Sequence, residues 1–221
     1  TMGDMARRRK EIVERLRQEG VVDLQKDLPL SMFAQDIAVI SSRGAAGYDD
    51  FCNQLQENRF GLHFCVTLFP ATMQGEGVED SVVAALDSIM ASDSDFDAVV
   101  IIRGGGSTSD LSGFDTLRLA ENVANFPLPI ITGIGHNRDE SVLDIIAHKS
   151  VKTPTAAATF LIENLARTLT AITDAGNSIS RYATQRLRYE RQRLTQASMG
   201  FTSKAVLATT RQASQLKQLS E

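Results

Sequence analysis

Two short segments of this 221-residue chain combine glycines with side chains that bind phosphate or move a proton. In one, Arg103 is followed by Gly104, Gly105, Gly106 and Ser107. In the other, His136 follows Gly133-Ile134-Gly135, and Asp139 comes three residues later. Glycines let an anion approach backbone N–H groups, a guanidinium donates paired hydrogen bonds to phosphate, and an imidazole transfers protons near neutral pH. These residue types predict a site that binds and cleaves a phosphate ester.

Both segments follow short apolar runs that predict buried strands. The predicted strands cover residues 36–41, 61–69, 97–102 and 128–132. The predicted helices that follow them cover residues 45–57, 78–91, 114–125 and 140–148. Strands that alternate with helices in this way form right-handed βαβ units. The sequence therefore predicts an α/β fold with a doubly wound, mostly parallel sheet.

The loops that leave the carboxyl ends of parallel strands lie along one edge of a sheet, and ligands bind there. Three glycine-bearing loops are expected at this edge, at residues 41–46, 103–107 and 133–139. We therefore expect Ser41 and Ser42 to join the glycine-rich loop in binding phosphate. The sequence does not specify the order of the strands.

Each candidate residue also has a purely structural interpretation. Arg103 could be an incidental arginine in a glycine-rich turn, and His136 could bond only to backbone. The loop after Arg103 fits neither a P-loop nor a dinucleotide fingerprint, and Ser107 lies outside any nucleophile-elbow pattern. The other two histidines, His63 in a predicted strand and His148 at a predicted helix end, are expected to be structural.

The aspartates near these loops have competing roles as well. Asp49 lies in the first turn of a predicted helix, where a carboxylate compensates the helix dipole. Asp110 could bind a metal ion, whereas Asp115 is expected to cap the helix that follows it. Asp144 is expected to be a helix residue or a partner of the functional side chains.

Several spaced motifs resemble the large subunits of exodeoxyribonuclease VII. The runs RGGGSTSDLSGFD (103–115) and PIITGIGHNRDESVLDIIAHKSVKTPTAAA (129–158) match that family's arginine–triple-glycine–serine loop, its glycine–histidine loop and its Thr-Pro segment. Upstream, residues 38–49 fit its first strand and Gly-Ala-Ala loop, and Pro70 with Gln74-Gly75 fits its Pro-x-x-x-Gln-Gly element. The motifs occur in the family's order along the chain.

The resemblance implies an exonuclease that degrades single-stranded DNA to short oligonucleotides by phosphodiester hydrolysis, with water as the nucleophile. It implies that His136 transfers the proton and that Arg103 stabilises charge on the phosphate. Asp49 and Asp139 would orient water, the histidine or a cation. The family does not strictly need a divalent metal, and Mg²⁺ at Asp110 or Asp139 stays open.

Some features depart from the family pattern. Asn137 stands where the family usually has glutamate, and Arg43 lies in a first loop that is shorter than usual. Family members begin with an OB-type domain that binds single strands, and this chain is expected to start after it. We therefore expect a catalytic core with only the first part of the family's helical region.

Apolar residues recur at three- to four-residue spacing after Thr153-Pro154, which favours a long amphipathic, coiled-coil-like helix with a candidate break at 199–202. We divide the chain into an N-terminal helix and connector (1–30), an α/β catalytic domain (31–155) and a helical extension (156–221). The resemblance implies that a small subunit docks on this extension, and self-association through it is a second expectation.

Composition sets further bounds. The net charge of −4 argues against a protein that coats nucleic acid generally, although local basic clusters can still contact phosphates. The two cysteines lack metal-ligand spacing and predict reduced thiols in the cytoplasm. No apolar run is long enough for a membrane span. The alternatives to a nuclease are a nucleotide- or phosphate-binding module and an oligomerisation scaffold, both without catalysis.

Overall fold

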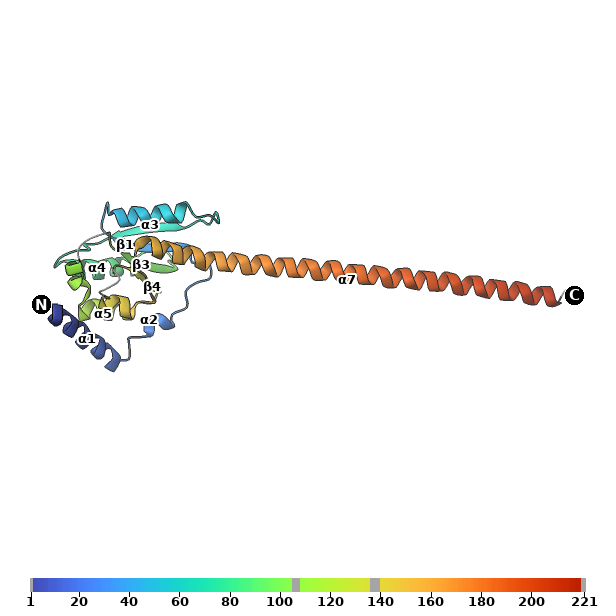
Figure 1. Cartoon of the computed structure of the whole chain (residues 1–221), viewed down its shortest axis with the longest axis horizontal. Coiled ribbons are helices and arrows are strands. Elements are labelled where there is room, and N and C mark those ends of the chain that lie inside the picture. Colours follow the sequence, from blue (N-terminus) through green and yellow to red (C-terminus); the bar gives the residue numbers. More distant parts are fainter. Residues whose placement is uncertain (1, 105–107, 136–139, 220–221) are drawn as a thin grey trace. The chain divides into compact units, whose positions relative to one another are not determined.

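A computed structural model describes residues 2–104, 108–135 and 140–219, without the side chains of 2–4 and 108–110. It confirms the predicted α/β fold (Figure 1). The sheet has five parallel strands in the order β2-β1-β3-β4-β5. They are β1 Asp36–Ser41, β2 Cys65–Pro70, β3 Ala98–Ile102, β4 Ile130–Gly133 and β5 Lys149–Ser150. The predicted strand 61–69 was too long at its start, and β5, with two residues, is too short to leave a pattern in the sequence.

The described helices include one that is much shorter than predicted. They are α1 Met2–Gln18, α2 Leu24–Asp27, α3 Ala46–Gln56, α4 Val78–Met90, the 3-10 helix η1 Thr108–Phe114, α5 Leu117–Ala124, α6 Val142–Ile146 and α7 Pro154–Leu219. The prediction of a helix over 140–148 was wrong at both ends. A capping box of Ser141 and Asp144 starts α6, and Ala147 already has extended backbone geometry, with ψ of 153°.

Helices cover both faces of the sheet, so the doubly wound arrangement is confirmed. Successive strand residues point to opposite faces, which gives the sheet two separate apolar layers. Helices α1, α4, α5 and α6 pack over Ala38, Ile40, Val99, Ile101 and Ile130. Helix α3 and the first turns of α7 pack over Ile37, Val39, Val100, Ile102 and Ile131. Figure 1 shows α3 on the opposite side of the sheet from α5.

The N-terminal helices belong to the core of this α/β unit. In α1, Ile12, Val13 and Leu16 are buried in the same apolar layer as α4 and α5. In α2, Gln25 is fully buried, donates to the Phe126 carbonyl at 2.8 Å and accepts from the Ile130 N–H at 2.8 Å. The side-chain amide of Gln25 therefore connects α2 to the start of β4.

The chain divides into two compact units, Thr1–Leu169 and Thr170–Glu221. In the second unit, every described side chain except Glu190 is exposed. Helix α7 continues across residues 199–202, so the expected break there was wrong; a single glycine, Gly200, weakens a helix by only about 1 kcal/mol and does not end it without a proline. None of the helices in the described part of the chain is both long and apolar enough to span a membrane.

Candidate active site

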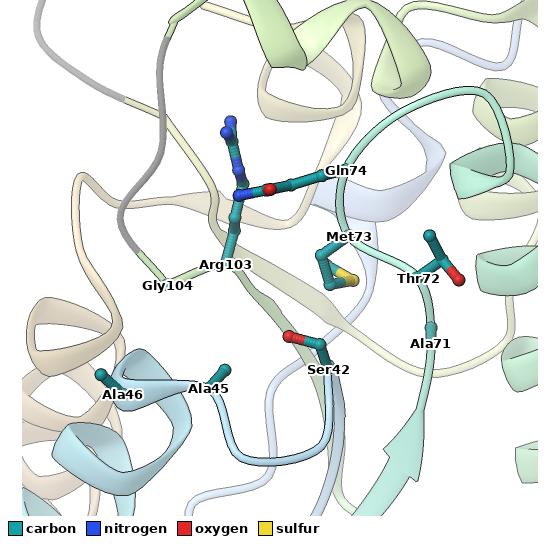
Figure 2. A pocket seen from close by; sticks show the side chains of 9 residues that line it. All are labelled: Ser42, Ala45, Ala46, Ala71, Thr72, Met73, Gln74, Arg103 and Gly104. Carbon is teal, nitrogen blue, oxygen red and sulfur yellow. The ribbon is translucent and has the colours of Figure 1, made fainter.

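The strand order places a ligand-binding position between β1 and β3. From β1 the chain moves outward to β2, then returns past β1 to β3, so the direction of winding reverses between these two strands. Ligands of open parallel sheets bind at such a point, beyond the carboxyl ends of the strands. A pocket of about 480 Å³ occupies this position (Figure 2). Its lining consists of Ser42, Ala45, Ala46, Ala71, Thr72, Met73, Gln74, Arg103 and Gly104.

Among the described residues that line this pocket, Arg103 is the only charged one. It follows β3 directly, and its N–H donates to the Gly133 carbonyl at 3.4 Å, which continues the β3–β4 pairing by one residue. Only 6% of Arg103 is exposed. A positive charge that is largely removed from water in this way attracts an anion more strongly than the charge of a surface arginine does.

The N-terminus of α3 forms another wall of the pocket. Its N-cap residue, Ala45, has no side-chain oxygen to occupy the first N–H groups of the helix, and Ala46 is the first helical residue. The first amides of a helix lack the carbonyl partners that later amides find one turn back, and the helix dipole adds positive potential there. In α3 the Tyr48 N–H already donates to the Ala45 carbonyl at 2.9 Å, so the amides of Ala46 and Gly47 are the candidates for binding an anion. The N-terminus of α3 therefore adds positive potential to that of Arg103, and both attract an anion.

Gly47 allows three elements to meet at this wall. A Cβ at Gly47 would lie 2.9 Å from the Gly104 Cα and 2.9 Å from the Pro154 Cγ, closer than side chains normally approach. The absence of a side chain lets the loop after β3 and the first turn of α7 pack directly on α3. The requirement at this position is therefore close approach rather than an unusual backbone angle.

The structure brings only part of the predicted site together. Ser42 lines the pocket, but Ser41 does not; it is fully buried in β1, and its hydroxyl has no hydrogen-bond partner among the described residues. Asp49 is exposed in the first turn of α3 and is not part of the pocket lining. The predicted site residues Gly105, Gly106, Ser107, His136 and Asp139 lie outside the described residues, as does the side chain of Asp110.

The loop after β2 contributes lining residues that the sequence analysis did not include in the site. Thr72, Met73 and Gln74 come from this loop, and the Thr72 N–H donates to the Ser81 hydroxyl at 2.8 Å, which ties the loop to α4. Figure 2 shows the Gln74 and Arg103 side chains extending into the same pocket from different walls. The Pro70 and Gln74-Gly75 motif at the end of a strand was the signal that could have identified them.

Asp115 does not cap α5, so that prediction was wrong. The N-cap is Thr116, without a side-chain capping bond. The Asp115 carboxylate instead pairs with Arg9 and accepts the Val142 N–H at 2.8 Å, so it serves the N-terminus of α6. Burial raises the pKa of Asp115, while Arg9 and the Val142 N–H act in the opposite direction. The sequence could not indicate this role, because the start of α6 comes next to Asp115 only in the folded chain.

Asp144 is a structural carboxylate with all its bonds inside the protein. One oxygen accepts the Thr132 hydroxyl at 2.6 Å and the Ser150 hydroxyl at 3.1 Å. The other accepts the Ser141 N–H at 3.0 Å and the Ser141 hydroxyl at 2.7 Å. These four bonds join the start of α6 to β4 and β5. They fix the backbone on both sides of the segment that contains His136 and Asp139.

The remaining histidines, His63 and His148, do not line this pocket. The Nδ1 of His148 lies 3.0 Å from the Gln25 carbonyl and forms a hydrogen bond with it. His63 is exposed and lies just before β2 rather than inside the strand. Among the described residues, no three His, Cys, Asp or Glu side chains are grouped as for a metal ion.

A second pocket, of about 440 Å³, lies between α3 and the segment that leads into β2. Tyr48 and Cys52 line it. Burial, helped by the bond to Cys52, raises the pKa of Tyr48 to about 12, and burial also raises the pKa of the Cys52 thiol. Both groups are therefore protonated at neutral pH, so the reactive thiolate form of Cys52 is disfavoured.

Comparison with known proteins shows the family of this chain. Residues 21–221 match the family model for the exonuclease VII large subunit. The exodeoxyribonuclease 7 large subunit of Cyanothece sp. is 36% identical over 199 residues, which cover 87% of this chain and 46% of that protein. The protein of the same name from Nostoc sp. is 38% identical over 165 residues, or 75% and 39% of the two chains. That of Lactobacillus johnsonii is 33% identical over 171 residues, or 77% and 37%. The chain therefore spans less than half the length of these three relatives.

Proposed function

Because the chain belongs to the exonuclease VII large-subunit family, we propose that it is the core of an exonuclease that hydrolyses single-stranded DNA to short oligonucleotides. The observation that supports this most is the position of Arg103. Arg103 is buried and lines a pocket at the switch point of the sheet, and the uncapped N-terminus of α3 lines the same pocket. Both features favour a bound phosphate.

In the proposed reaction, the scissile phosphate occupies the pocket and water is the nucleophile. Arg103 and the first amides of α3 stabilise the negative charge that builds up on the phosphate oxygens. Ser42 and the loop Gly104–Ser107 donate further hydrogen bonds. His136 transfers the proton between water, phosphate and leaving group, and Asp139 orients the imidazole.

The roles of Ser41 and Asp49 are less direct. Ser41 is fully buried and does not line the pocket, so its hydroxyl would not contact DNA directly. Asp49 lies on the first turn of the helix that binds phosphate, where it orients water or a cation at the edge of the pocket. We propose no strict requirement for a divalent metal; Mg²⁺ is an optional ligand of Asp110 and Asp139.

We also propose that the helical segment recruits a small subunit. From Leu169 onward, the large apolar side chains of α7 are exposed, including Ile172, Ile179, Leu187 and Leu194. An exposed apolar series on a helix is covered by a partner helix or by a second copy of the chain. The name of these relatives, large subunit, favours a smaller partner, with self-association as the second arrangement. Both cysteines are free, in keeping with the proposed cytoplasmic location.

The decisive experiment measures cleavage of 5′-labelled single-stranded DNA by the holoenzyme, with and without a chelator. We expect His136→Ala to lose about 10²–10⁴-fold in turnover while DNA affinity stays near that of the wild type. His63→Ala is the matched control, because His63 is exposed and lies outside the pocket. Loss of cleavage in chelator would contradict the metal proposal alone.

A binding module without chemistry would give a different result. It would show no release of oligonucleotides by the wild type and no effect of His136→Ala beyond that of the control. A His136→Ala enzyme that kept more than about a tenth of wild-type turnover would contradict the general acid–base role.

A further inference from the structure

Gln74 is a polar residue of the described pocket that the proposed reaction leaves without a role. It lies in the loop after β2 and lines the pocket together with Arg103. Its side chain points toward that of Arg103, whereas the Thr72 side chain of the same loop points away from it (Figure 2). Gln74 is exposed, so its amide is accessible to a ligand that enters the pocket.

The backbone on both sides of Gln74 is held by contacts of its neighbours. The Ala71 N–H donates to the Ser41 carbonyl at 2.9 Å, which extends the pairing of β1 with β2 by one residue. Met73 is only 3% exposed and belongs to the apolar layer under α4 and α5. Gly75 has a φ of 81°, a left-handed conformation that glycine adopts without strain. Gln74 is therefore the exposed residue of an anchored turn.

The charges around Gln74 favour an anion in this pocket. Arg103 is 6% exposed, and none of the described residues that line the pocket is acidic. Ala46 and Gly47 begin α3 on another wall, where the helix dipole adds positive potential. Because Gln74 points toward Arg103, an anion bound to the guanidinium lies in the direction of its amide.

The amide of a glutamine is well suited to such an anion. Its nitrogen carries two N–H donors, and the group has no charge of its own. A hydrogen bond to an ionised acceptor is shorter and roughly twice as strong as one between neutral groups. Amide side chains aimed at the position where negative charge develops also stabilise a transition state. A phosphodiester presents two non-bridging oxygens, so one can bind Arg103 while the Gln74 amide donates to the other.

We propose that Gln74 is a further catalytic residue of the nuclease site: its Nε2 donates a hydrogen bond to a non-bridging oxygen of the phosphate that Arg103 binds. This inference rests on the proposed nuclease function. It assigns to the loop after β2 a direct contact with DNA, in addition to the contacts from the loops after β1 and β3.

The test compares three variants of the holoenzyme in steady-state cleavage of single-stranded DNA. Gln74→Met keeps the length of the side chain but removes the donor, and Gln74→Glu keeps the shape but places a carboxylate beside the phosphate. Gln54→Met is the matched control, at an exposed position of α3 that does not line the pocket. We expect Gln74→Met to lower kcat/KM about 10- to 100-fold, as for the loss of one hydrogen bond to a charged group. Gln74→Glu should lower it further, and Gln54→Met should match the wild type.

A second measurement identifies the atom that Gln74 contacts. Sulfur accepts hydrogen bonds only weakly, so we compare two forms of the DNA, each with sulfur at one of the two non-bridging positions of its phosphates. The wild type should cleave one form more slowly than the other. In Gln74→Met most of that difference should disappear, because the contact is already absent. A purely structural role of Gln74 would leave the ratio of the two rates unchanged.

The outcomes are distinguishable. If the wild type cleaves DNA but Gln74→Met cleaves it as fast as Gln54→Met does, the inference is overturned while the proposed function stands. The same holds if the ratio of the two sulfur-containing forms is equal in Gln74→Met and in the wild type. A loss that varies with the base beside the cleaved bond would mean that Gln74 contacts a base, which also overturns the inference. If the wild type cleaves no DNA at all, the proposed function falls, and the inference falls with it.

Discussion

Helix α7 buries its apolar residues in one part and exposes them in another. In its first turns, Ala158, Leu161 and Ile162 are buried against the sheet, with at most 6% exposed. Further along, Ile179, Leu187 and Leu194 are between 61% and 71% exposed. The spacing of apolar residues is similar in both parts, so it predicts a helix in each. Spacing alone does not predict what covers the apolar side chains.

The difference separates the proposed chemistry from the proposed assembly. Residues 1–169 contain the buried apolar core and the pocket with Arg103, whereas the large apolar side chains of residues 170–219 are exposed. Substitutions in the first unit should therefore change cleavage or folding without preventing recruitment of a partner. Substitutions in the second should do the reverse. Each variant described next is compared with a control at an exposed position of the second unit.

The largest effect is expected from Arg103→Lys. Lysine keeps the positive charge but loses the planar fork that matches phosphate oxygens, so it should cost nearly as much as Arg103→Ala. Loss of one preorganised donor at a developing anion lowers kcat by about 10²–10³-fold. Steady-state cleavage of single-stranded DNA measures this, with Arg186→Lys on the exposed part of α7 as the control. Near-normal cleavage by Arg103→Lys would mean that Arg103 acts only through its positive charge.

Asp144→Ala should give the largest loss of stability. It leaves the hydroxyls of Thr132 and Ser141, both fully buried, without their carboxylate partner. We expect the free energy of unfolding of the α/β unit to decrease by about 3 kcal/mol. Urea denaturation, followed by a signal from that unit, measures it. Asp174→Ala, at an exposed position of α7, should leave that free energy unchanged. Equal values for the two variants would show that the network around Asp144 contributes nothing.

The elements of the sheet could be predicted from the sequence because buried parallel strands are continuous apolar runs. The exceptions have local causes. Strand β5 has only Lys149 and Ser150, neither of them apolar. The length of α6 was overestimated. The apolar pattern continues over 140–148, but the capping box at Ser141 and the extended backbone of Ala147 limit the helix to 142–146.

The candidate site could be predicted only where it follows directly from a strand end. Arg103, Gly104 and Ser42 belong to the loops after β3 and β1, and the general rule for parallel sheets places those loops together. Gln74 joins them because β2 lies beside β1, and the sequence does not reveal that order. Asp115 was misassigned because its position favours a local cap, whereas burial and the pairing with Arg9 favour a partner 27 residues away.

The exposed part of α7 should lose its partner when its apolar residues become charged. Leu187→Asp with Leu194→Asp places two carboxylates where a partner helix would bury leucines, each worth about 1.5–3 kcal/mol when fully covered. Sedimentation should show a smaller assembly, while cleavage per core chain at saturating DNA should change little. Arg188→Asp, an exposed but already polar position, is the control. A wild-type monomer whose segment 170–219 resists proteolysis without any partner would count against an assembly role.

The smallest effect is a difference in the pH dependence of stability. Burial raises the pKa of Asp115 in the folded chain, although Arg9 and the Val142 N–H oppose it. A raised pKa means that the folded state holds the proton more tightly than the unfolded state does. The stability that Asp115 contributes is then fully present below its ordinary pKa and is lost as the pH rises through the folded pKa.

Asp115→Asn removes this titration but keeps an oxygen that can accept the Val142 N–H. The free energy of unfolding of the wild type should therefore decrease relative to that of Asp115→Asn as the pH rises above the ordinary range of an aspartate. Asp174→Asn, at an exposed position of α7, should follow the wild type at every pH. The measurement is urea denaturation at a series of pH values. A wild type that instead gains stability over Asp115→Asn with rising pH would mean that the attraction of Arg9 outweighs burial. In that case the pair would stabilise the fold as an ion pair, and α1 would bind most firmly where Asp115 is fully charged.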